Sequence, residues 1–310
     1  MKLLVLGATG FVGKTVSNYL DTVKIPHVKS SRSLGCDLLN YEQTLALFKS
    51  TQPDYVLNCA AHVGSLNYVT KMAADVISDN SRMNLNIYQA IAEVCPKTIL
   101  INPMANCAYP AHADTFIEDE WMSGHLHRSV LSYGASKRLL WHIGESYYMQ
   151  YGIKSIYLFV PNMYGAFDST DPNKAHALDA LISKFVKAEK ENKKEIEIWG
   201  TGIAVREWLY AEDFARICES ILTQKITIGL DEPVNIAQNF GLSVRELVQL
   251  INAKFNHAFQ IRWNHNMPDG SPRKVMDDRR FRKVFGNFAF TPLDKGIDHT
   301  IAYYKGVYPY

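Results

Sequence analysis

The heptapeptide GATGFVG follows an apolar run, KLLVLG, and precedes residues with helical spacing. A short apolar run that ends in glycine is typical of a fully buried strand. In a strand–turn–helix unit, Gly7 permits the tight turn, Gly10 lets the backbone approach a pyrophosphate, and Gly13 lets the helix pack closely on the strand. The spacing therefore favours a dinucleotide-binding turn over a tight turn without a ligand, with the phosphates at the helix N-terminus.

Strands and helices alternate along the first half of the chain. The expected strands are 2–7, 26–31, 54–61, 98–103 and 155–161, and the expected helices are 11–20, 41–50, 80–94 and 132–151. The strands are continuous apolar runs, which indicates that both faces of the sheet are covered. This order predicts the α/β class, with a Rossmann-type doubly wound parallel sheet.

The pattern changes after residue 161. Residues 162–173 are rich in Gly, Asp, Pro and Asn and predict a long loop. A helix over 175–192, a strand at EIEIWG and a helix over 211–222 follow, and residues 240–310 carry two more helical patterns and the loop NMPDGSPRK. We expect a cofactor-binding domain over 1–165, with a returning segment near 205–237. A smaller substrate-binding domain would comprise 166–204 and 238–310.

Composition excludes several classes of protein. The 310 residues are 47% hydrophobic and 21% charged, with a net charge of only +2, which is ordinary for a globular protein and gives no reason to expect a nucleic-acid or membrane partner. The apolar N-terminus is interrupted after six residues, too soon for a signal segment or membrane span. Five cysteines without a CxxC pair predict reduced thiols in the cytoplasm and no metal site.

The end of the second expected strand bears on the choice of cofactor. An NAD-binding chain normally has Asp or Glu there, to bind the ribose 2′-hydroxyl. This chain has Ser30, Ser31, Arg32 and Ser33 instead. A guanidinium pairs well with a 2′-phosphate, so the sequence predicts NADP(H). Asp37, a few residues later, is expected at the adenine edge.

The segment YGASK places Tyr133 and Lys137 one helical turn apart, on the same face of an expected helix. A nearby ammonium should lower the pKa of a phenol because it stabilises the phenolate. Such a tyrosine can donate its proton to a carbonyl oxygen while a hydride reaches the carbon. By chance alone, this spacing would more often give an exposed pair.

The motifs GATGFVG, AAHVG, CAYP, YGASK, PNMYG, WGTGIAVREWLY and PDGSPRKVMD occur in this order along nearly the whole chain. In this respect the chain resembles the extended short-chain dehydrogenase/reductases of the NAD-dependent epimerase/dehydratase family, and most of all the GDP-L-fucose synthases. The resemblance implies NADPH-dependent reduction of a nucleotide-linked 4-keto-6-deoxy sugar, with C3/C5 epimerisation. It also implies a homodimer formed through helices 80–94 and 132–151.

The resemblance assigns roles to individual residues. Catalytic roles fall on Tyr133, Lys137, Cys107 and His176, the last two as acid/base partners. The implied substrate-binding residues are Asn162, His176, Lys184, Trp199, Arg206 and Lys274. The implied cofactor-binding residues are Gly7, Thr9, Gly10, Phe11, Val12, Gly13, Ser31, Arg32, Asp37, Leu38, Ala60, Ala61, Lys137, Pro161 and Asn162.

One position departs from the pattern of the family. Four residues before Tyr109, where the fold normally has a Ser or Thr that binds the substrate carbonyl, this chain has Ala105. Losing one such donor typically costs about 10²–10³ in rate. The amide of Asn106, the next residue, is the candidate replacement and joins the predicted catalytic residues.

Other functions remain open from the sequence. A 4,6-dehydratase would carry Thr-Asp-Glu where this chain has Ala105, Asn106 and Cys107. A plain 4-reductase or 4-epimerase, acting on a dTDP-sugar or a GDP-heptose, would leave Cys107 and His176 idle, and both could then be packing residues. A decayed NADP-binding regulator is a further alternative. Which base and which sugar are bound is not encoded in these motifs.

Overall fold

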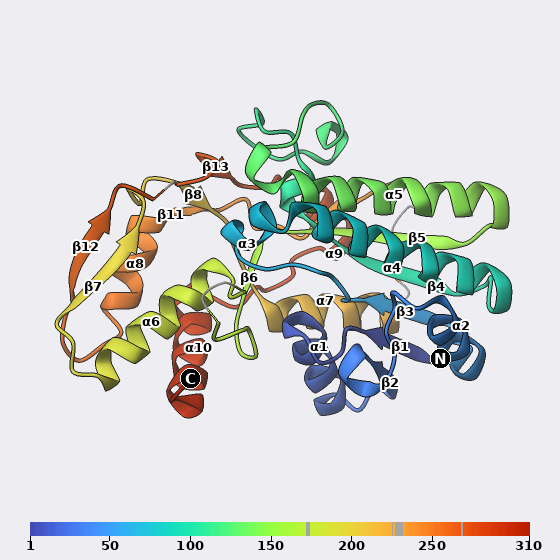
Figure 1. Cartoon of the computed structure of the whole chain (residues 1–310), viewed down its shortest axis with the longest axis horizontal. Helices are drawn as coiled ribbons and strands as arrows, with labels where there is room; N and C mark the ends of the chain where they lie inside the picture. Colours follow the sequence, from blue (N-terminus) through green and yellow to red (C-terminus); the bar gives the residue numbers. More distant parts are fainter. Residues whose placement is uncertain (172–173, 225, 227–231, 268) are drawn as a thin grey trace.

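A computed structural model of the chain describes residues 1–171, 174–224, 226, 232–267 and 269–310. Within this part, six strands form a parallel sheet in the order β10-β5-β4-β3-β1-β2 (Figure 1). Their bounds are β1 Leu3–Leu6, β2 His27–Ser30, β3 Tyr55–Asn58, β4 Ile99–Ala105, β5 Lys154–Val160 and β10 Val234–Asn235. The doubly wound parallel sheet predicted from the apolar runs is confirmed.

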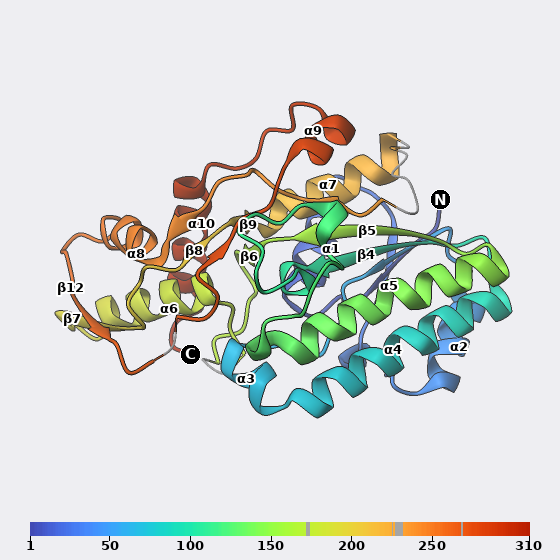
Figure 2. The ribbon, with the colours of Figure 1, turned by 90° about the horizontal axis from the view of Figure 1, so that it is seen from above.

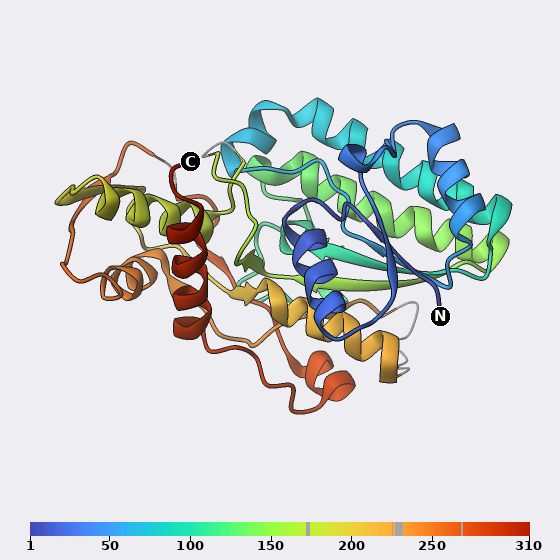
Figure 3. The ribbon, with the colours of Figure 1, turned by 90° about the horizontal axis from the view of Figure 1, so that it is seen from below.

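Helices cover both faces of this sheet (Figures 2 and 3). On one face lie α2 (Tyr41–Thr51), α4 (Ala73–Val94) and α5 (Leu131–Tyr151), with α4 and α5 side by side. On the other face lie α1 (Phe11–Thr22) and α7 (Ala211–Gln224), packed against each other. Each layer buries its own apolar cluster: Phe48 and Ile91 belong to the first, and Val16 and Phe214 to the second.

A second group of elements lies beside the sheet and its helices (Figure 1). It comprises α6 (Ala177–Lys190), α8 (Val244–Asn252), α10 (Leu293–Val307) and the parallel pair β7 (Glu195–Trp199) and β12 (Gln260–Asn264). These elements share a third apolar cluster, which includes Phe185, Leu247 and Ile301. The N-terminus of α8 is capped by Ser243 and Glu246, which form a capping box.

Short strands connect the two groups. β6 (Asn162–Tyr164) pairs with β9 (Trp208–Tyr210), and β8 (Val205–Arg206) lies between β11 (Leu242–Ser243) and β13 (Arg273–Lys274). After β9, the chain returns to the main sheet through α7 and β10, and β11 and β13 follow later in the sequence. Residues 205–237 thus contribute to both groups, although 225 and 227–231 lie outside the described residues.

The expected elements differ from the observed ones at a few places. α4 begins seven residues before the expected 80, and α3 (Leu66–Lys71) was not expected. The predicted loop 162–173 contains β6, and its positions 172–173 lie outside the description, as does position 268 of the PDGSPRK loop. The region 240–310 has three described helices instead of two, because the seven-residue α9 (Arg279–Phe285) is too short to show a clear period.

Candidate functional site

The glycine turn leaves open space at the start of α1. A Cβ on Gly7, whose φ is +70°, would lie 2.7 Å from the Ala60 nitrogen, and one on Gly13 would lie 2.2 Å from the Gly7 oxygen. Gly10, in contrast, would meet only the Gly7 oxygen, at 3.4 Å. Gly10 caps α1 without a side-chain hydrogen bond, and no acid lies in the first turn. Uncapped N–H groups beside exposed Gly10 and Thr9 fit a pyrophosphate.

The residues after β2 fit a second, smaller anion. Ser33 hydrogen-bonds through its hydroxyl to Thr9, at 2.9 Å, and to Ser31, at 3.0 Å. Arg32 is exposed, and within the part of the chain that the structure describes no carboxylate lies at ion-pair distance from its guanidinium. A cation beside three hydroxyls has the donors that a 2′-phosphate needs.

The other predicted cofactor residues follow the carboxyl ends of neighbouring strands. Phe11 and Val12 are half-buried in the first turn of α1, and Ala60 and Ala61 are half-buried after β3. The loop after β2 holds Asp37, whose Oδ1 accepts from the Leu39 N–H at 3.0 Å, and buried Leu38, whose oxygen accepts from Asn86 at 2.8 Å. Pro161 is buried at the end of β5, and Asn162 donates through its backbone and side-chain nitrogens to the Glu207 oxygen, both at 3.2 Å.

Tyr133 and Lys137 lie on the first two turns of α5. Gly134, between them, makes this position possible, because its Cβ would lie 2.5 Å from the Cys107 oxygen. Lys137 is buried and donates from Nζ to the Pro103 oxygen at 2.8 Å, with Nζ 5.6 Å from the centre of the Tyr133 ring. The close approach brings the YGASK face of α5 against the end of β4.

Burial controls the acidity of this pair. It raises the pKa of Tyr133 well above its usual value, and the neighbouring Cys107 adds to the effect. It also lowers the pKa of Lys137 to about 8. The expected lowering of the Tyr133 pKa by Lys137 is therefore not observed, since the ammonium faces the Pro103 carbonyl and desolvation dominates. At neutral pH the phenol keeps its proton, as a proton donor must.

The turn after β4 carries Ala105, Asn106 and Cys107. Cys107 is buried; desolvation raises the pKa of its thiol, and the charges of Lys274 and Lys137 oppose that rise. The Asn106 amide nitrogen is buried and has no hydrogen-bond partner among the described residues. An unsatisfied buried donor costs about 1–3 kcal/mol. A substrate oxygen at this point would satisfy it.

His176 immediately precedes α6. Its Nδ1 lies 3.0 Å from Asp168 Oδ1, and its backbone N–H donates to Asp168 Oδ2 at 2.6 Å. The imidazole centre is 5.4 Å from the ring centre of Phe11, the first residue of α1. The histidine therefore lies between the second group of elements and the start of the predicted cofactor helix.

The predicted substrate cations fall into two sets. Arg206 and Lys274 are register partners on β8 and β13, and Lys274 interacts electrostatically with both Arg206 and Cys107. Lys184 belongs to the other set: its Nζ donates to the Glu197 oxygen at 2.9 Å and lies 5.7 Å from the ring centre of half-exposed Trp199. The first set adjoins the turn of Cys107, and the second lies on α6 and β7.

Three residues that join parts of the site were not predicted from the sequence. Asp269 joins Arg206 to the turn after β7, because its side chain accepts from Thr201 N–H (2.7 Å) and hydroxyl (2.6 Å), while its backbone oxygen accepts from Arg206 at 3.1 Å. The other two are Arg138, which bonds to the Ala108 oxygen beside Cys107, and Asp168, which contacts His176. Asp269 lies inside the quoted PDGSPRK motif and Arg138 directly follows YGASK, so the motifs marked the segments but not these roles.

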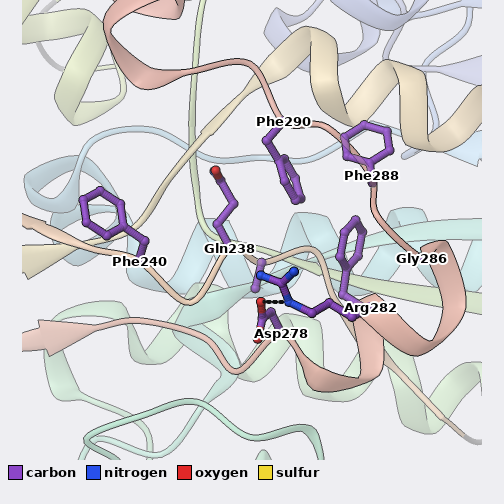
Figure 4. Close-up of a pocket in the computed structure, with 9 residues that line it drawn as sticks. Gln238, Phe240, Asp278, Arg282, Gly286, Phe288 and Phe290 are labelled. Atoms are coloured by element: carbon purple, nitrogen blue, oxygen red, sulfur yellow. Dashed lines mark hydrogen bonds and ion pairs between the residues drawn. The ribbon is translucent and has the colours of Figure 1, made fainter.

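A cavity of about 280 Å³ lies elsewhere, beside α9 (Figure 4). Aromatic rings of Phe240, Phe288 and Phe290 surround it, and Arg282 donates to Asp278 at 2.5 Å on its wall. None of the predicted site residues lines it. Among the described residues, no cluster of His, Cys, Asp and Glu could hold a metal ion, and no helix is long and apolar enough to cross a membrane.

The chain is similar to several known proteins. It is 29% identical over 304 residues to the Oryza sativa subsp. japonica protein named "Probable GDP-L-fucose synthase 1", covering 98% of this chain and 92% of that one. A solved structure of a GDP-L-fucose synthetase from Naegleria fowleri bound to NADP has a TM-score of 0.86 at 24% identity, covering 99% and 93% of the two chains. A GDP-6-OMe-4-keto-L-xylo-heptose reductase from C. jejuni has a TM-score of 0.88 at 22% identity, covering 98% and 97%.

The two structural likenesses agree with the fold described above. Residues 3–237, which include the glycine turn, the Cys107 turn and the YGASK helix, match the model of one family. The order of the motifs had indicated the same assignment, and it is confirmed: the chain belongs to the NAD dependent epimerase/dehydratase family.

Proposed function

We propose that the protein reduces the C4 ketone of a nucleotide-linked 4-keto-6-deoxy sugar with NADPH, and that it also epimerises C3 and C5. The observation that carries the proposal is the close approach of Gly134 to the Cys107 oxygen. This approach brings Tyr133 and Cys107 to one strand end, which supports the roles we propose for them as proton donor and acid/base residue. GDP is the proposed nucleotide, because the relatives are named as GDP-sugar enzymes.

NADPH, when bound, supplies the hydride that reaches C4. The residues proposed to hold it are those of the glycine turn, with Arg32 and the hydroxyls around Ser33 at the 2′-phosphate. Tyr133 donates its proton to the C4 oxygen, and Lys137 is its partner residue on the next turn of α5. The buried amide nitrogen of Asn106 has no hydrogen-bond partner among the described residues, which supports assigning it the role of the missing Ser or Thr.

Epimerisation needs two groups on opposite sides of the sugar. The C4 ketone acidifies the hydrogens on C3 and C5, because the electron pair left behind spreads onto the carbonyl oxygen. We assign Cys107 to one side and His176 to the other. A free thiol and a free imidazole both titrate close enough to neutrality to exchange protons with carbon acids of this kind. Arg206, Lys274 and Lys184 are proposed to bind the diphosphate, and Trp199 to lie near the base.

A plain 4-reductase is the second candidate. Burial raises the pKa of the Cys107 thiol, which opposes its use as a base. One structural neighbour is named as a GDP-6-OMe-4-keto-L-xylo-heptose reductase. In this alternative, Tyr133 and Lys137 act as proposed while Cys107 and His176 only pack.

The two candidates are separated by isotope exchange. The protein is incubated in D₂O with a panel of nucleotide 4-keto sugars and without NADPH, and the sugars are examined by NMR. Deuterium at C3 and C5 supports epimerisation, and Cys107→Ser should then lose most of it while still reducing a pre-epimerised substrate. Reduction without exchange in the wild type would leave only the 4-reductase, and no NADPH consumption with any sugar of the panel would refute both.

We also propose that the two groups of elements bind different molecules. Residues 1–165 with 205–237 would bind the cofactor, and 166–204 with 238–310 would bind the nucleotide sugar. We also propose a location in the cytoplasm, which the five free cysteines support.

A further inference from the structure

We propose that Asp168 is a positioning residue that fixes the ring orientation and tautomer of His176, so that Nε2 is the atom that exchanges protons with the substrate. This inference rests on the proposed function. Its starting point is that one carboxylate holds His176 at two places, with Oδ1 on the ring and Oδ2 on the backbone N–H. The Asp168 side chain is only 3% exposed, whereas that of His176 is 33% exposed. The ring is therefore fixed on its buried edge and open on the other.

A second carboxyl fixes the loop that carries Asp168. Asp179, in the first turn of α6, is fully buried and accepts from the Gly165 N–H at 3.1 Å through Oδ1. Its Oδ2 has no hydrogen-bond partner within the described residues. Burial raises the pKa of Asp179 far above its usual value, and the charge of Asp168 adds to that rise. Both causes favour the protonated form of Asp179, which fixes the loop at Gly165 while Asp168 contacts His176.

The same loop is also held from α1. Thr15 donates to the Ala166 oxygen at 3.5 Å, and Lys14 Nζ lies 4.6 Å from the ring centre of Phe167. With the contact between Phe11 and His176, these interactions place the imidazole relative to the predicted cofactor helix. The orientation that Asp168 imposes is therefore maintained relative to both groups of elements.

The chemical consequence concerns which nitrogen carries the proton. A neutral ring that donates Nδ1–H to Asp168 presents a lone pair at Nε2, and a protonated ring presents Nε2–H. In the epimerisation step, one base removes a proton from C3 or C5 and the electron pair moves to the C4 oxygen. A proton then returns to the same carbon on its opposite face, and the carbonyl re-forms. No electrons leave the sugar, so His176 needs only the correct tautomer and direction.

The test compares Asp168→Asn with Asp168→Glu and with the matched control Asp179→Asn, which removes a buried carboxyl of α6 that bonds to the same loop at Gly165. Ring ¹⁵N NMR, assigned with His176→Asn, reports the tautomer. We expect Nδ1–H in the wild type and in the control, and a shift towards Nε2–H in Asp168→Asn, because the asparagine amide can donate to Nδ1. Exchange at C3 and C5 should fall on the order of 10²–10⁴-fold. Reduction of a pre-epimerised substrate should change less than about threefold, and Asp168→Glu should restore part of the exchange and the Nδ1–H signal.

Two outcomes overturn the proposal: a wild-type His176 that carries its proton on Nε2, or an Asp168→Asn variant with the changed tautomer and undiminished exchange. If Asp168→Asn does not fold, the comparison of Asp168→Glu with the wild type decides. If the wild type shows no exchange at all, the epimerase function fails, and the tautomer measurement alone then decides whether Asp168 positions the ring.

Discussion

Arg32 is the side chain on which the predicted preference for NADPH over NADH depends. It is exposed, its neighbours Ser31 and Ser33 offer hydroxyls, and no acid takes the position that would bind a ribose 2′-hydroxyl. Replacing Arg32 by Ala should weaken NADPH binding by about 10- to 100-fold, since a charge-assisted hydrogen bond contributes about 1.5–3 kcal/mol. NADH binding should barely change, and fluorescence titration measures both. Tighter binding of NADH than of NADPH by the wild type would contradict the assignment.

Tyr133 is the residue on which the proposed reduction should depend. Its phenol keeps its proton at neutral pH, because burial raises its pKa. Tyr133→Phe removes only the hydroxyl and should lower the rate of NADPH oxidation at least about 100-fold, the usual share of a general acid. NADPH affinity should stay near that of the wild type. If more than a tenth of the activity remains, another group donates the proton.

At the scale of elements, Glu207 joins three segments. It lies between β8 and β9, is fully buried, and accepts from the Gln238 N–H at 2.6 Å and from the Met276 N–H at 2.8 Å. Burial raises its pKa from 4.5 to about 7. Between these pH values, the folded protein keeps a proton that the unfolded chain has lost. The free energy of unfolding must therefore fall as the pH rises through this range.

At about 1.4 kcal/mol per pH unit, this contribution reaches at most about 3.5 kcal/mol. Glu207→Gln, which stays neutral, should lose that part of the fall, although its amide satisfies one backbone N–H less well and should lower stability at all pH values. Urea unfolding of both proteins at pH 5 and pH 8 measures the difference. Equal losses in the two proteins would show that Glu207 does not titrate in this range.

Elements with many residues were predictable from the sequence, and short ones were not. β4 and β5 have seven residues each, most of them apolar, and α5 carries a recognisable motif in its first two turns. In contrast, β8 and β13 have two residues each, too few for any period. At the site, the glycine turn and YGASK can be recognised from the spacing of their residues alone. Asp168 acts through a residue eight positions away, in a loop whose path the sequence does not determine, so its role appeared only in the structure.

At the scale of the whole molecule, α4 and α5 carry an exposed apolar stripe. Ile77 and Leu85 are eight residues apart on α4, and Leu131 and Leu139 have the same spacing on α5, so each pair lies on one face of its helix. All four side chains are 37–53% exposed. We propose that these faces meet their counterparts in a second copy across a two-fold axis, as an isologous homodimer.

Light scattering at micromolar concentration should therefore give the mass of a dimer. Leu85→Glu combined with Leu139→Glu would bury charges at the two-fold contact and should shift the protein to the monomer. Exposed Leu34, in the turn after β2, supplies the control Leu34→Glu, and this variant should remain dimeric. A wild-type monomer would exclude the proposed assembly.

Arg138 has a consequence for how this molecule opens locally. Its guanidinium donates to the oxygens of Ala108, Trp121 and Gly124, at 2.8–2.9 Å, and so joins both ends of the long loop above α5 to one side chain (Figure 1). Since neither end of that loop can separate from α5 without breaking these bonds, the two ends should open together as one cooperative unit. The amides of residues 108–124 would then exchange their hydrogens with a common opening rate, and the turn of Cys107 would become exposed to solvent in the same event.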